Sequence, residues 1–455
     1  MTKDIFNIIE KDFILSRQQL EPIVKGFDQE YKMGLKTPSK GLATMIPSFV
    51  TKMPKGNETG TFLSLDMGGT NLRIAAVELK GAGKSIVHEL KRCPSIELKT
   101  GEGAMFFDWI ADAVRDLITI EAKHLFTQNQ VEGKETLALG VCWSFPVDQT
   151  AVDRGTILRM GKGFTLKNTE GNDLADMFHE AFKRKKLNVK VTAILNDTVG
   201  TLVAHAYTNP ECRIGLIFAT GINAAYPEKV SAITKLAPEV RNNYTPNTEM
   251  LINTEIDIFG TEAYLPLTKY DLALDLSHNQ PKFQLYEKML SGAYMGELTR
   301  LIAVDFIEAG LLFGGEMPKG FNQPWSFPTT YMSALESDQS ETKEVGQRIL
   351  TEFPTSEKPT LDDLNTLTRI CHIVAARSAS LVAVAIISLL EQQGLSDHMV
   401  VGINGSTYEF YPHMDQRVRQ ALDEWFGKEM SSKIILEVAS EGGSVGGALI
   451  AMLCE

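Results

Sequence analysis

The chain has 455 residues, more than one ordinary core holds, so we expect two domains or two lobes around a cleft. Hydrophobic residues make up 44% of it and charged residues 22%, which is typical of a globular protein. The formal net charge of −12 argues against general binding of nucleic acids or anionic membranes, because such binders need a concentrated basic surface. A small molecule is therefore the expected partner.

The N-terminal segment and the cysteines indicate a compartment. The run MTKDIFNIIEKDFILS mixes acidic with apolar residues, which predicts an amphipathic helix and not a signal peptide. The cysteines are scattered and lack metal-ligand spacing, which favours reduced thiols and argues against a zinc site. We expect a cytoplasmic protein. The cysteines are Cys93, Cys142, Cys212, Cys371 and Cys454.

The run TFLSLDMGGTNLRIAAVEL predicts a β-hairpin, because apolar residues alternate on both sides of a Gly68-Gly69 bend. Glycine lets backbone N–H groups converge without steric cost, and such a concave nest binds anionic oxygens. Thr70 and Asn71 add short polar side chains. Asp66 is placed to hold a hydrated Mg²⁺ over the phosphates of a nucleotide. The alternative is a Gly-Gly turn with a purely conformational role.

Three later stretches, at residues 194–207, 214–226 and 400–412, each combine an apolar strand pattern with a small-residue bend or a helix start. This rhythm is typical of an α/β protein. Residues 440–453 form a glycine-rich turn that feeds a helix of small residues. The most apolar window, residues 371–390, contains Arg377 and ends in Glu and Gln, so we expect a buried helix and no membrane span.

In this order the motifs resemble the sugar kinase, Hsp70 and actin superfamily, and more narrowly the eukaryotic hexokinases of fungal, single-unit size. The resemblance extends from about Gly41 to Leu453 and is carried by residues 144–164, 196–202, 265–271 and 286–298. It implies an α/β, two-lobed fold of the ribonuclease H-like type with a cleft between the lobes. The expected large lobe is 1–59 and 194–441, and the small lobe is 60–193 and 442–455. A monomer or a homodimer is expected.

The resemblance also implies the sugar site. Asp197 becomes the base that accepts the proton of the sugar hydroxyl, and Lys162 the cation that stabilises the transferring phosphoryl group. The alternatives are that Asp197 caps the following helix and that Lys162 is an ordinary surface lysine. The other positions that match the sugar-binding set are Ser144, Phe145, Gly161, Asn196, Asn223, Glu255 and Glu287.

For the nucleotide the resemblance implies ATP with Mg²⁺, which Asp66 reaches through water, without direct ligation by a side chain. Three groups of residues match. The first phosphate motif is Asp66, Gly68, Gly69, Thr70, Asn71 and Arg73; the second is Thr220 and Gly221; the adenosine end is Gly405, Ser406, Gly443 and Ser444.

Departures from the family pattern cluster at the sugar pocket. Gly161 stands where the family usually has Thr, and Ile256-Asp257 where it usually has Trp-Gly. Losing a threonine and an indole opens volume, and an apolar residue in place of the Trp resembles the fungal N-acetylglucosamine kinases. We therefore expect ATP-dependent phosphorylation of the 6-hydroxyl of a hexose-type sugar, with N-acetylglucosamine favoured over glucose.

A second group of departures lies at the nucleotide end. Ala219 replaces a usual Gly, Glu409 a usual Lys, and Gly442 and Val445 a usual Asp and Gly. Glu409 is expected to repel phosphates, and Val445 to crowd a turn that favours glycine. The rival hypothesis is accordingly a catalytically inactive, hexokinase-like regulatory protein that senses sugar.

Overall fold

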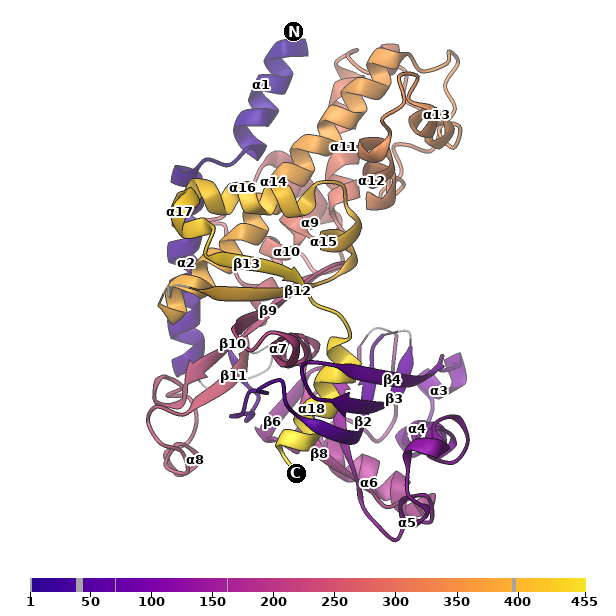
Figure 1. The fold of residues 1–455 in the computed structure, drawn as a ribbon. Helices are drawn as coiled ribbons and strands as arrows, with labels where there is room; N and C mark the ends of the chain where they lie inside the picture. Colours follow the sequence, from indigo (N-terminus) through magenta and orange to yellow (C-terminus); the bar gives the residue numbers. More distant parts are fainter. Residues whose placement is uncertain (1, 38–43, 70, 162, 395–397) are drawn as a thin grey trace.

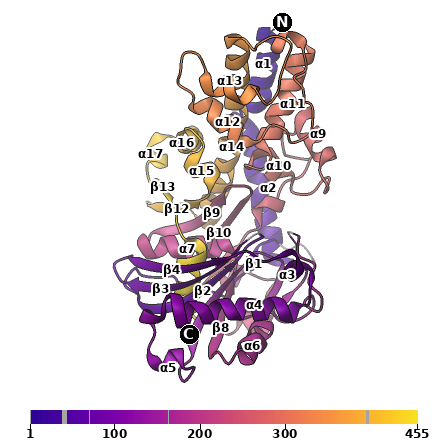
Figure 2. The same cartoon turned by 90° about the vertical axis from the view of Figure 1, so that its right-hand side faces the viewer.

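The computed structural model describes residues 2–37, 44–69, 71–161, 163–394 and 398–455, so the predictions for Thr70 and Lys162 lie outside the described residues. Two mixed sheets lie at different levels of an elongated molecule, with helices packed around them (Figures 1 and 2). This arrangement agrees with the predicted α/β class. The boundaries that we expect between the two lobes stay a prediction.

The first sheet contains the predicted hairpin and has the strand order β4-β3-β2-β5-β8. The hairpin strands β2 and β3 are antiparallel, whereas β5 and β8 run parallel to β2 and to each other. One face packs against α4 and α6 in an aromatic-rich core, and α18 packs on the strands β2, β5 and β8. The elements are β2 (Thr59–Met67), β3 (Leu72–Lys80), β4 (Ser85–Arg92), β5 (Leu137–Trp143), β8 (Val189–Leu195), α4 (Gly103–Asp116), α6 (Leu174–Arg184) and α18 (Gly447–Leu453).

The second sheet has the order β1-β11-β10-β9-β12-β13, in which β9, β12 and β13 are parallel and the other pairs antiparallel. The long helices α2 and α14 belong to the large core on this sheet. Figure 1 shows α7 and α18 between the two sheets. The elements are β1 (Ile46–Pro47), β9 (Cys212–Phe218), β10 (Ile222–Lys229), β11 (Glu249–Asn253), β12 (Met399–Asn404), β13 (Ile434–Val438), α2 (Arg17–Lys36), α7 (Asp197–Thr208) and α14 (Leu361–Gln393).

The other elements surround these layers. The predicted amphipathic helix at the N-terminus is α1, which buries Phe6, Ile9 and Phe13. The others are β6 (Val147–Ala151), β7 (Arg154–Ile157), α3 (Ile96–Thr100), α5 (Gln128–Val131), α8 (Pro238–Arg241), α9 (Lys269–Ser277), α10 (Leu285–Leu290), α11 (Met295–Glu308), α12 (Thr329–Ser337), α13 (Glu344–Leu350), α15 (Ser406–Phe410), α16 (Met414–Phe426) and α17 (Lys428–Ser431); α1 is Thr2–Phe13.

Glycines allow the backbones of α7, β5 and the C-terminal segment to meet. A Cβ at Gly140 would lie 2.0 Å from the carbonyl oxygen of Gly447, and a Cβ at Gly446 would lie 2.2 Å from that of Gly200. Real Cβ atoms do not approach backbone this closely, so larger residues would force the elements apart. The glycine-rich end predicted as a turn is itself helical, with a π turn at Gly442–Gly446 that continues into α18.

The apolar window that contains Arg377 is the centre of α14. By length and composition this helix is able to cross a membrane, but 89% of its apolar window is buried inside the protein. Arg377 is fully buried and pairs with both carboxylate oxygens of Asp271 at 2.8 Å. The predicted buried helix is therefore confirmed.

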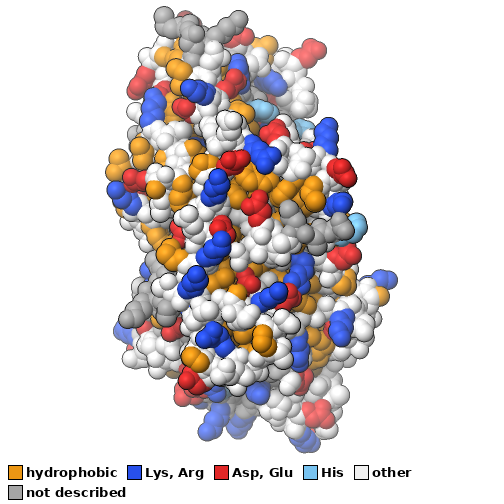
Figure 3. Space-filling view, turned by 90° about the vertical axis from the view of Figure 1, so that its left-hand side faces the viewer, with side chains coloured by type: hydrophobic (Ala, Val, Ile, Leu, Met, Phe, Trp, Pro, Cys, Tyr) orange, Lys and Arg blue, Asp and Glu red, His pale blue; other side chains and the backbone are white. Residues whose placement is uncertain are grey.

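On the face of the molecule drawn in Figure 3, acidic and basic side chains are interspersed.

Candidate active site

One cavity of about 430 Å³ connects the tip of the hairpin, the start of α7 and the turn before α18. It brings together predicted residues from opposite ends of the chain. Those that line it are Asp66, Gly68, Asn71, Arg73, Ser144, Asp197, Gly443 and Ser444; the rest of the lining is Val87, Glu89, Thr201, Ile217, Asn404, Glu441 and Gly442.

The hairpin at this cavity has the predicted form. The N–H of Gly68 donates to the carbonyl oxygen of Asn71 at 3.1 Å, which closes the tip, and Asp66 lies opposite Arg73 in the register. Their side chains approach to 3.7 Å, so Asp66 has a positive neighbour. A Cβ at Gly443 would lie 2.8 Å from Oδ2 of Asp66. The first phosphate motif and the adenosine end therefore touch, and the contact leaves no room for a side chain at residue 443.

The second phosphate motif is the bend between β9 and β10. Thr220 and Gly221 form it, and the Ala219 carbonyl oxygen accepts from the N–H of Gly292 at 2.9 Å and from the Thr407 hydroxyl at 2.8 Å. Gly405 has φ 139° and packs so closely that a Cβ would lie 2.3 Å from the Phe218 carbonyl oxygen. The structure places this bend beside the Gly405-Ser406 turn, although none of these four predicted residues lines the 430 Å³ cavity.

The departures at the nucleotide end are accommodated locally. The Glu409 carboxylate accepts from the N–H of Gly405 at 3.1 Å, so it is engaged in closing its own turn. Val445 is buried inside the π turn, and its backbone is not in the left-handed region, so the expected crowding is not observed. Gly442 replaces a usual Asp at a point where a Cβ would lie 2.5 Å from the Thr201 hydroxyl oxygen. These contacts are compatible with an ordered nucleotide side.

Asn196 and Asp197 begin α7 at the cavity. The Asn196 Oδ1 accepts from the backbone N–H of Thr198 at 2.9 Å and from its hydroxyl at 2.6 Å, so Asn196 is the cap of the helix. The Asp197 Oδ1 also accepts from the N–H of Thr198 at 2.9 Å, while the residue lines the cavity. The helix therefore already has a cap in Asn196, so capping alone does not account for Asp197 at this cavity.

Asn253 at the end of β11 joins the predicted sugar residues, and sequence reasoning missed it. Its Oδ1 accepts from Nδ2 of Asn223 at 3.0 Å, and its own Nδ2 donates to Oε1 of Glu255 at 2.6 Å. Asn223 also donates to that oxygen of Glu255, at 3.1 Å. The hydroxyl of Thr198 lies 3.4 Å from Oδ1 of Asn253, which extends the network to α7. Asn253 is buried, and only the pairing of β11 with β10 reveals its place.

Glu255 is held in an unusual state. Its φ of 50° is in the left-handed region, which costs a non-glycine residue free energy and is frequent at functional sites. Burial raises the pKa of its carboxyl to about 8, with further contributions from the charges of Asp257 and Asp197. Hydrogen bonds from Asn253 and Asn223 oppose that rise. A sugar hydroxyl that donates to this carboxylate would favour its charged form.

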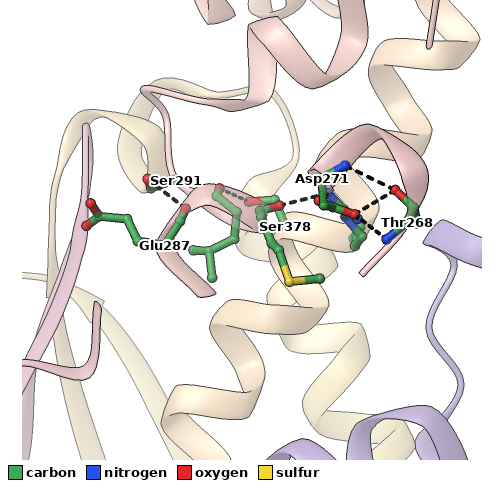
Figure 4. A network of polar contacts seen from close by, with 8 residues as sticks. Thr268, Asp271, Glu287, Ser291 and Ser378 are labelled. Atoms are coloured by element: carbon green, nitrogen blue, oxygen red, sulfur yellow. Dashed lines mark hydrogen bonds and ion pairs between the residues drawn. The ribbon is translucent and has the colours of Figure 1, made fainter. Parts of the chain in front are cut away.

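Glu287 projects from α10 to the second phosphate motif. Its Oε2 accepts from the N–H of Ile222 at 3.0 Å, and a Cβ at Gly221 would lie only 2.5 Å from that oxygen. In Figure 4 the Glu287 carboxylate lies on the side opposite Ser378 and Asp271. The backbone of α10 is tied to α14, because Ser378 donates to the Leu290 carbonyl oxygen at 2.6 Å. The sugar glutamate and the Thr220-Gly221 bend are therefore in direct contact.

Of the remaining predicted sugar residues, Ser144 and Phe145 directly follow β5, and Gly161 lies in the loop after β7. Ser144 lines the cavity, whereas Phe145 is buried in the aromatic core, with its ring 5.2 Å from those of Trp143 and Phe164. Phe145 thus packs against Phe164 and supports the segment that carries it. A Cβ at Gly161 would meet no atom within 4 Å in the described part of the chain, so the missing threonine leaves open space.

Lys99, in the last turn of α3, is a second residue that the sequence did not reveal. Its Nζ lies 3.5 Å from the Gly69 carbonyl oxygen and 5.0 Å from the ring centre of Phe164. Its own carbonyl oxygen accepts from the N–H of Thr165 at 2.8 Å. Lys99 thereby connects the phosphate hairpin with the segment at Phe164 and Thr165. The short exposed helix that carries it has no motif that could have marked it.

Comparison with known proteins identifies the family. Two models, both described as Hexokinase, match residues 5–207 and 213–453 of the chain. The chain belongs to the hexokinase family. Hexokinase-1 of Schizosaccharomyces pombe is 35% identical over 99% of this chain and 91% of its own length, and the hexokinase of Emericella nidulans is 36% identical over 98% and 89%. Family membership makes the protein a sugar kinase, a phosphotransferase that acts on hexoses.

Solved structures of hexokinases also align with the whole chain. The structure titled as the hexokinase from Schistosoma mansoni complexed with glucose is 32% identical and aligns with a TM-score of 0.81 over 99% of both chains. A second crystal structure, titled hexokinase, is 27% identical and aligns with a TM-score of 0.85 over 99% of both chains. The two-lobed sugar kinase fold and the resemblance to hexokinases are confirmed. The N-acetylglucosamine kinase branch stays a prediction.

Proposed function

We propose that this protein transfers the γ-phosphoryl group of ATP to the 6-hydroxyl of a hexose. One observation carries the proposal: Asp197 lines the same cavity as Asp66 and Gly443, and through Thr198 it adjoins the network of Asn253 and Glu255. A base, a sugar-binding set and a phosphate-binding hairpin therefore converge. Phosphoryl transfer needs this combination of positioning, charge neutralisation and proton acceptance.

Asp197 is the proposed base. It lines the cavity together with the phosphate hairpin, and through Thr198 it adjoins the sugar network, so a primary hydroxyl bound there could reach it. Asn196, Asn223, Glu255 and Glu287 are the proposed readers of the other hydroxyls. Amides and carboxylates left unpaired in a closed pocket are costly, so such a set discriminates strongly between sugars that do and do not present the matching hydroxyls.

ATP and Mg²⁺ are the proposed phosphoryl donor and metal. The residues fit them: Gly68 and Asn71 of the hairpin tip line the cavity, and Asp66 presents a carboxylate to it beside Arg73. Within the described residues, no group of three or more His, Cys, Asp or Glu side chains is arranged to hold a metal ion by itself. We assign Asp66 to a water-mediated contact with the metal, as the first phosphate motif implies. When bound, the metal would neutralise phosphate charge.

Glucose and N-acetylglucosamine are the two candidate substrates. Open space beside Gly161 favours the larger N-acetylated sugar. Ile256 does not add to that argument, because it is fully buried in the core, and Asp257 next to it brings a carboxylate close to the pocket. We rank a simple hexose such as glucose first, since hexokinases are the relatives along the whole chain. N-acetylglucosamine is the second candidate.

The test is a coupled ADP-release assay with glucose, fructose, mannose and N-acetylglucosamine, each at millimolar concentration. Turnover of a hexose with none of N-acetylglucosamine supports the first candidate, and the reverse supports the second. No turnover of any sugar would overturn the kinase proposal and would support the inactive regulatory protein. We do not favour that rival, because Glu409 and Val445 make internal contacts.

A further inference from the structure

Asp257 lies between the two sugar glutamates in a way that their roles do not explain. It belongs to the short 3-10 turn Ile256–Ile258 that directly follows Glu255, and only 8% of its surface is exposed. Its Oδ2 accepts a hydrogen bond from Nε2 of Gln284 at 2.6 Å. Its Oδ1 is buried and has no hydrogen-bond partner among the described residues. A buried carboxylate with an unpaired oxygen is costly and calls for a compensating role.

The partner of Asp257 stands at the start of α10. Gln284 immediately precedes this helix and has a φ of 55°, while Glu255, two residues before Asp257, has a φ of 50°. Left-handed backbone at non-glycine residues persists only where surrounding contacts hold it. The Asp257–Gln284 hydrogen bond links these two strained points. It therefore fixes the segment that carries Glu255 relative to the helix that carries Glu287.

Helix α10 is too short to hold itself in place. It has six residues, and helices of that length are not stable without tertiary contacts. Its far side is held by α14, where Ser378 donates to the Leu290 carbonyl oxygen and Arg377 to that of Met289. On the side of the sugar pocket, Gln284 supplies the contact to Asp257. Loss of this contact would free one end of the helix.

Charges from several elements face Asp257. Burial raises the pKa of its carboxyl to about 7, and the charges of Glu287 on α10 and Asp197 on α7 add to that rise. In return, the charge of Asp257 helps to raise the pKa of Glu255. Burial raises the pKa of the Tyr294 phenol, just before α11, and the charges of Glu287 and Asp257 add to that rise. Asp257 is thus electrostatically connected to the base and to both glutamates.

We propose that Asp257 is a positioning residue for the sugar pocket: through its hydrogen bond with Gln284 it holds Glu255 and Glu287 at the spacing that a hexose requires. The inference rests on the proposed sugar kinase function. On this inference, the Ile256-Asp257 pair, which stands where the family usually has Trp-Gly, changes how the pocket is supported. It does not enlarge the pocket.

The test compares Asp257→Ala, Gln284→Ala, the double variant and Asp257→Asn in the full chain. Because a hydrogen bond to a charged group is lost, Asp257→Ala raises the KM for the sugar roughly tenfold or more, with kcat within about twofold of the parent. Gln284→Ala has a similar effect. The double variant is no worse than the more affected single variant, because both substitutions remove the same bond.

Asp257→Asn separates geometry from charge. Asparagine retains an oxygen that accepts from Gln284, so the KM at neutral pH stays within about twofold of the parent. The pKa of Glu255 falls once the neighbouring charge is gone, so the acid limb of kcat/KM moves to lower pH. Asp338→Asn is the matched control: Asp338 is also a buried carboxylate, but its contacts are with the Ser340–Val345 segment. We expect Asp338→Asn to leave the acid limb of kcat/KM unchanged.

Sugar dissociation constants from tryptophan fluorescence, measured without nucleotide, keep this test separate from turnover. If the parent binds sugar but shows no turnover, the kinase proposal fails while the Asp257 variants are still compared by dissociation constant. Additive effects of Asp257→Ala and Gln284→Ala would overturn the positioning role. The positioning role would also be overturned if Asp257→Ala bound sugar with the affinity of the parent and Asp257→Asn kept the acid limb of the parent. Changes in melting temperature alone would not support it.

Discussion

The nucleotide side and the sugar side of the candidate site are built from different chemical groups. On the nucleotide side, glycines let segments pack closely: Gly443 packs against the Asp66 carboxylate, and Gly405 packs against the backbone of Phe218. On the sugar side, amide and carboxylate side chains hold one another, as Asn253 holds Glu255. The first construction tolerates changes in side-chain chemistry but not in size. The second tolerates small changes in size but depends on every donor, acceptor and proton.

The largest effect is expected at the base between the two sides. Asp197→Ala should lower kcat by about 10²–10⁴, the usual range for a general base, and leave sugar affinity within a fewfold of the parent. Steady-state kinetics and fluorescence titration measure the two quantities. Asp173→Ala is the control, because Asp173 caps α6 through the N–H of Asp176 and lies outside the cavity. Equal losses of activity in both variants would reduce Asp197 to a structural cap.

The support of the sugar side should be sensitive to Arg377. Arg377→Met leaves Asp271 buried without its partner, so the free energy of unfolding should fall by about 3–5 kcal/mol. Urea denaturation followed by circular dichroism measures this. Arg369→Met is the matched control: Arg369 is on the same helix and pairs with Glu10 on the surface, so its loss costs about 1 kcal/mol or less. Similar losses in both variants would contradict the special position of Arg377.

Gly443→Ala should act on the nucleotide side alone. Its Cβ would lie 2.8 Å from Asp66, so the carboxylate or the turn must shift, and the KM for ATP should rise roughly tenfold. The KM for the sugar should not change. Gly161→Ala is the counterpart, since its Cβ has open space in the described structure. The two-sided description fails if Gly443→Ala alters the KM of the sugar as much as that of ATP.

The sugar side should show a pH dependence with a definite sign. The folded-state pKa of Glu255 is raised from 4.5 to about 8, so ionisation opposes folding, and stability is lost as pH rises from about 4.5 through 8. Glu255→Gln should therefore melt at a higher temperature than the parent at pH 8 and at nearly the same temperature at pH 5. Calorimetry without sugar detects the difference. A variant less stable than the parent at pH 8 would contradict the raised pKa.

The smallest effect is expected at Lys99, which touches both sides. Lys99→Met should raise the KM for ATP a fewfold, because a half-buried cation beside the hairpin is only one of several contacts. The increase should shrink at high salt, as for any partly exposed charge. Lys99→Arg should restore part of the affinity, whereas Lys134→Met, at an exposed lysine on the surface, should have no effect. Salt-independent loss in Lys99→Met would indicate a purely structural role.

Local patterns predicted much of this molecule. The alternation around Gly68 determined the hairpin, and the small-residue pattern after Asn196 determined α7, because both depend on neighbours in the sequence. Asn253 and Lys99 were not predictable in this way. Their roles arise from contacts with β10 and with the hairpin tip, which strand pairing and packing create.

Departures from the family pattern were harder still to interpret. Val445 adopts helical backbone in a π turn, so the crowding expected from its residue type is not observed. Glu409 closes its own turn, and the expected repulsion of phosphates stays a prediction. Ile256 is fully buried, and the expected gain of pocket volume at this position stays a prediction. Residue identity predicts the chemistry of a site, whereas the space around a side chain depends on segments far away in the chain.

The position of α18 has a consequence for synthesis. This helix packs on β2, β5 and β8, the last of which ends at Leu195, but α18 itself begins only at Gly447. At about 5–20 residues per second, a ribosome needs roughly 10–50 s to make the intervening chain. Throughout that time the nascent sheet lacks the helix that covers Ala75 and Cys142. The emerging polypeptide therefore exposes an apolar surface of the kind that molecular chaperones recognise.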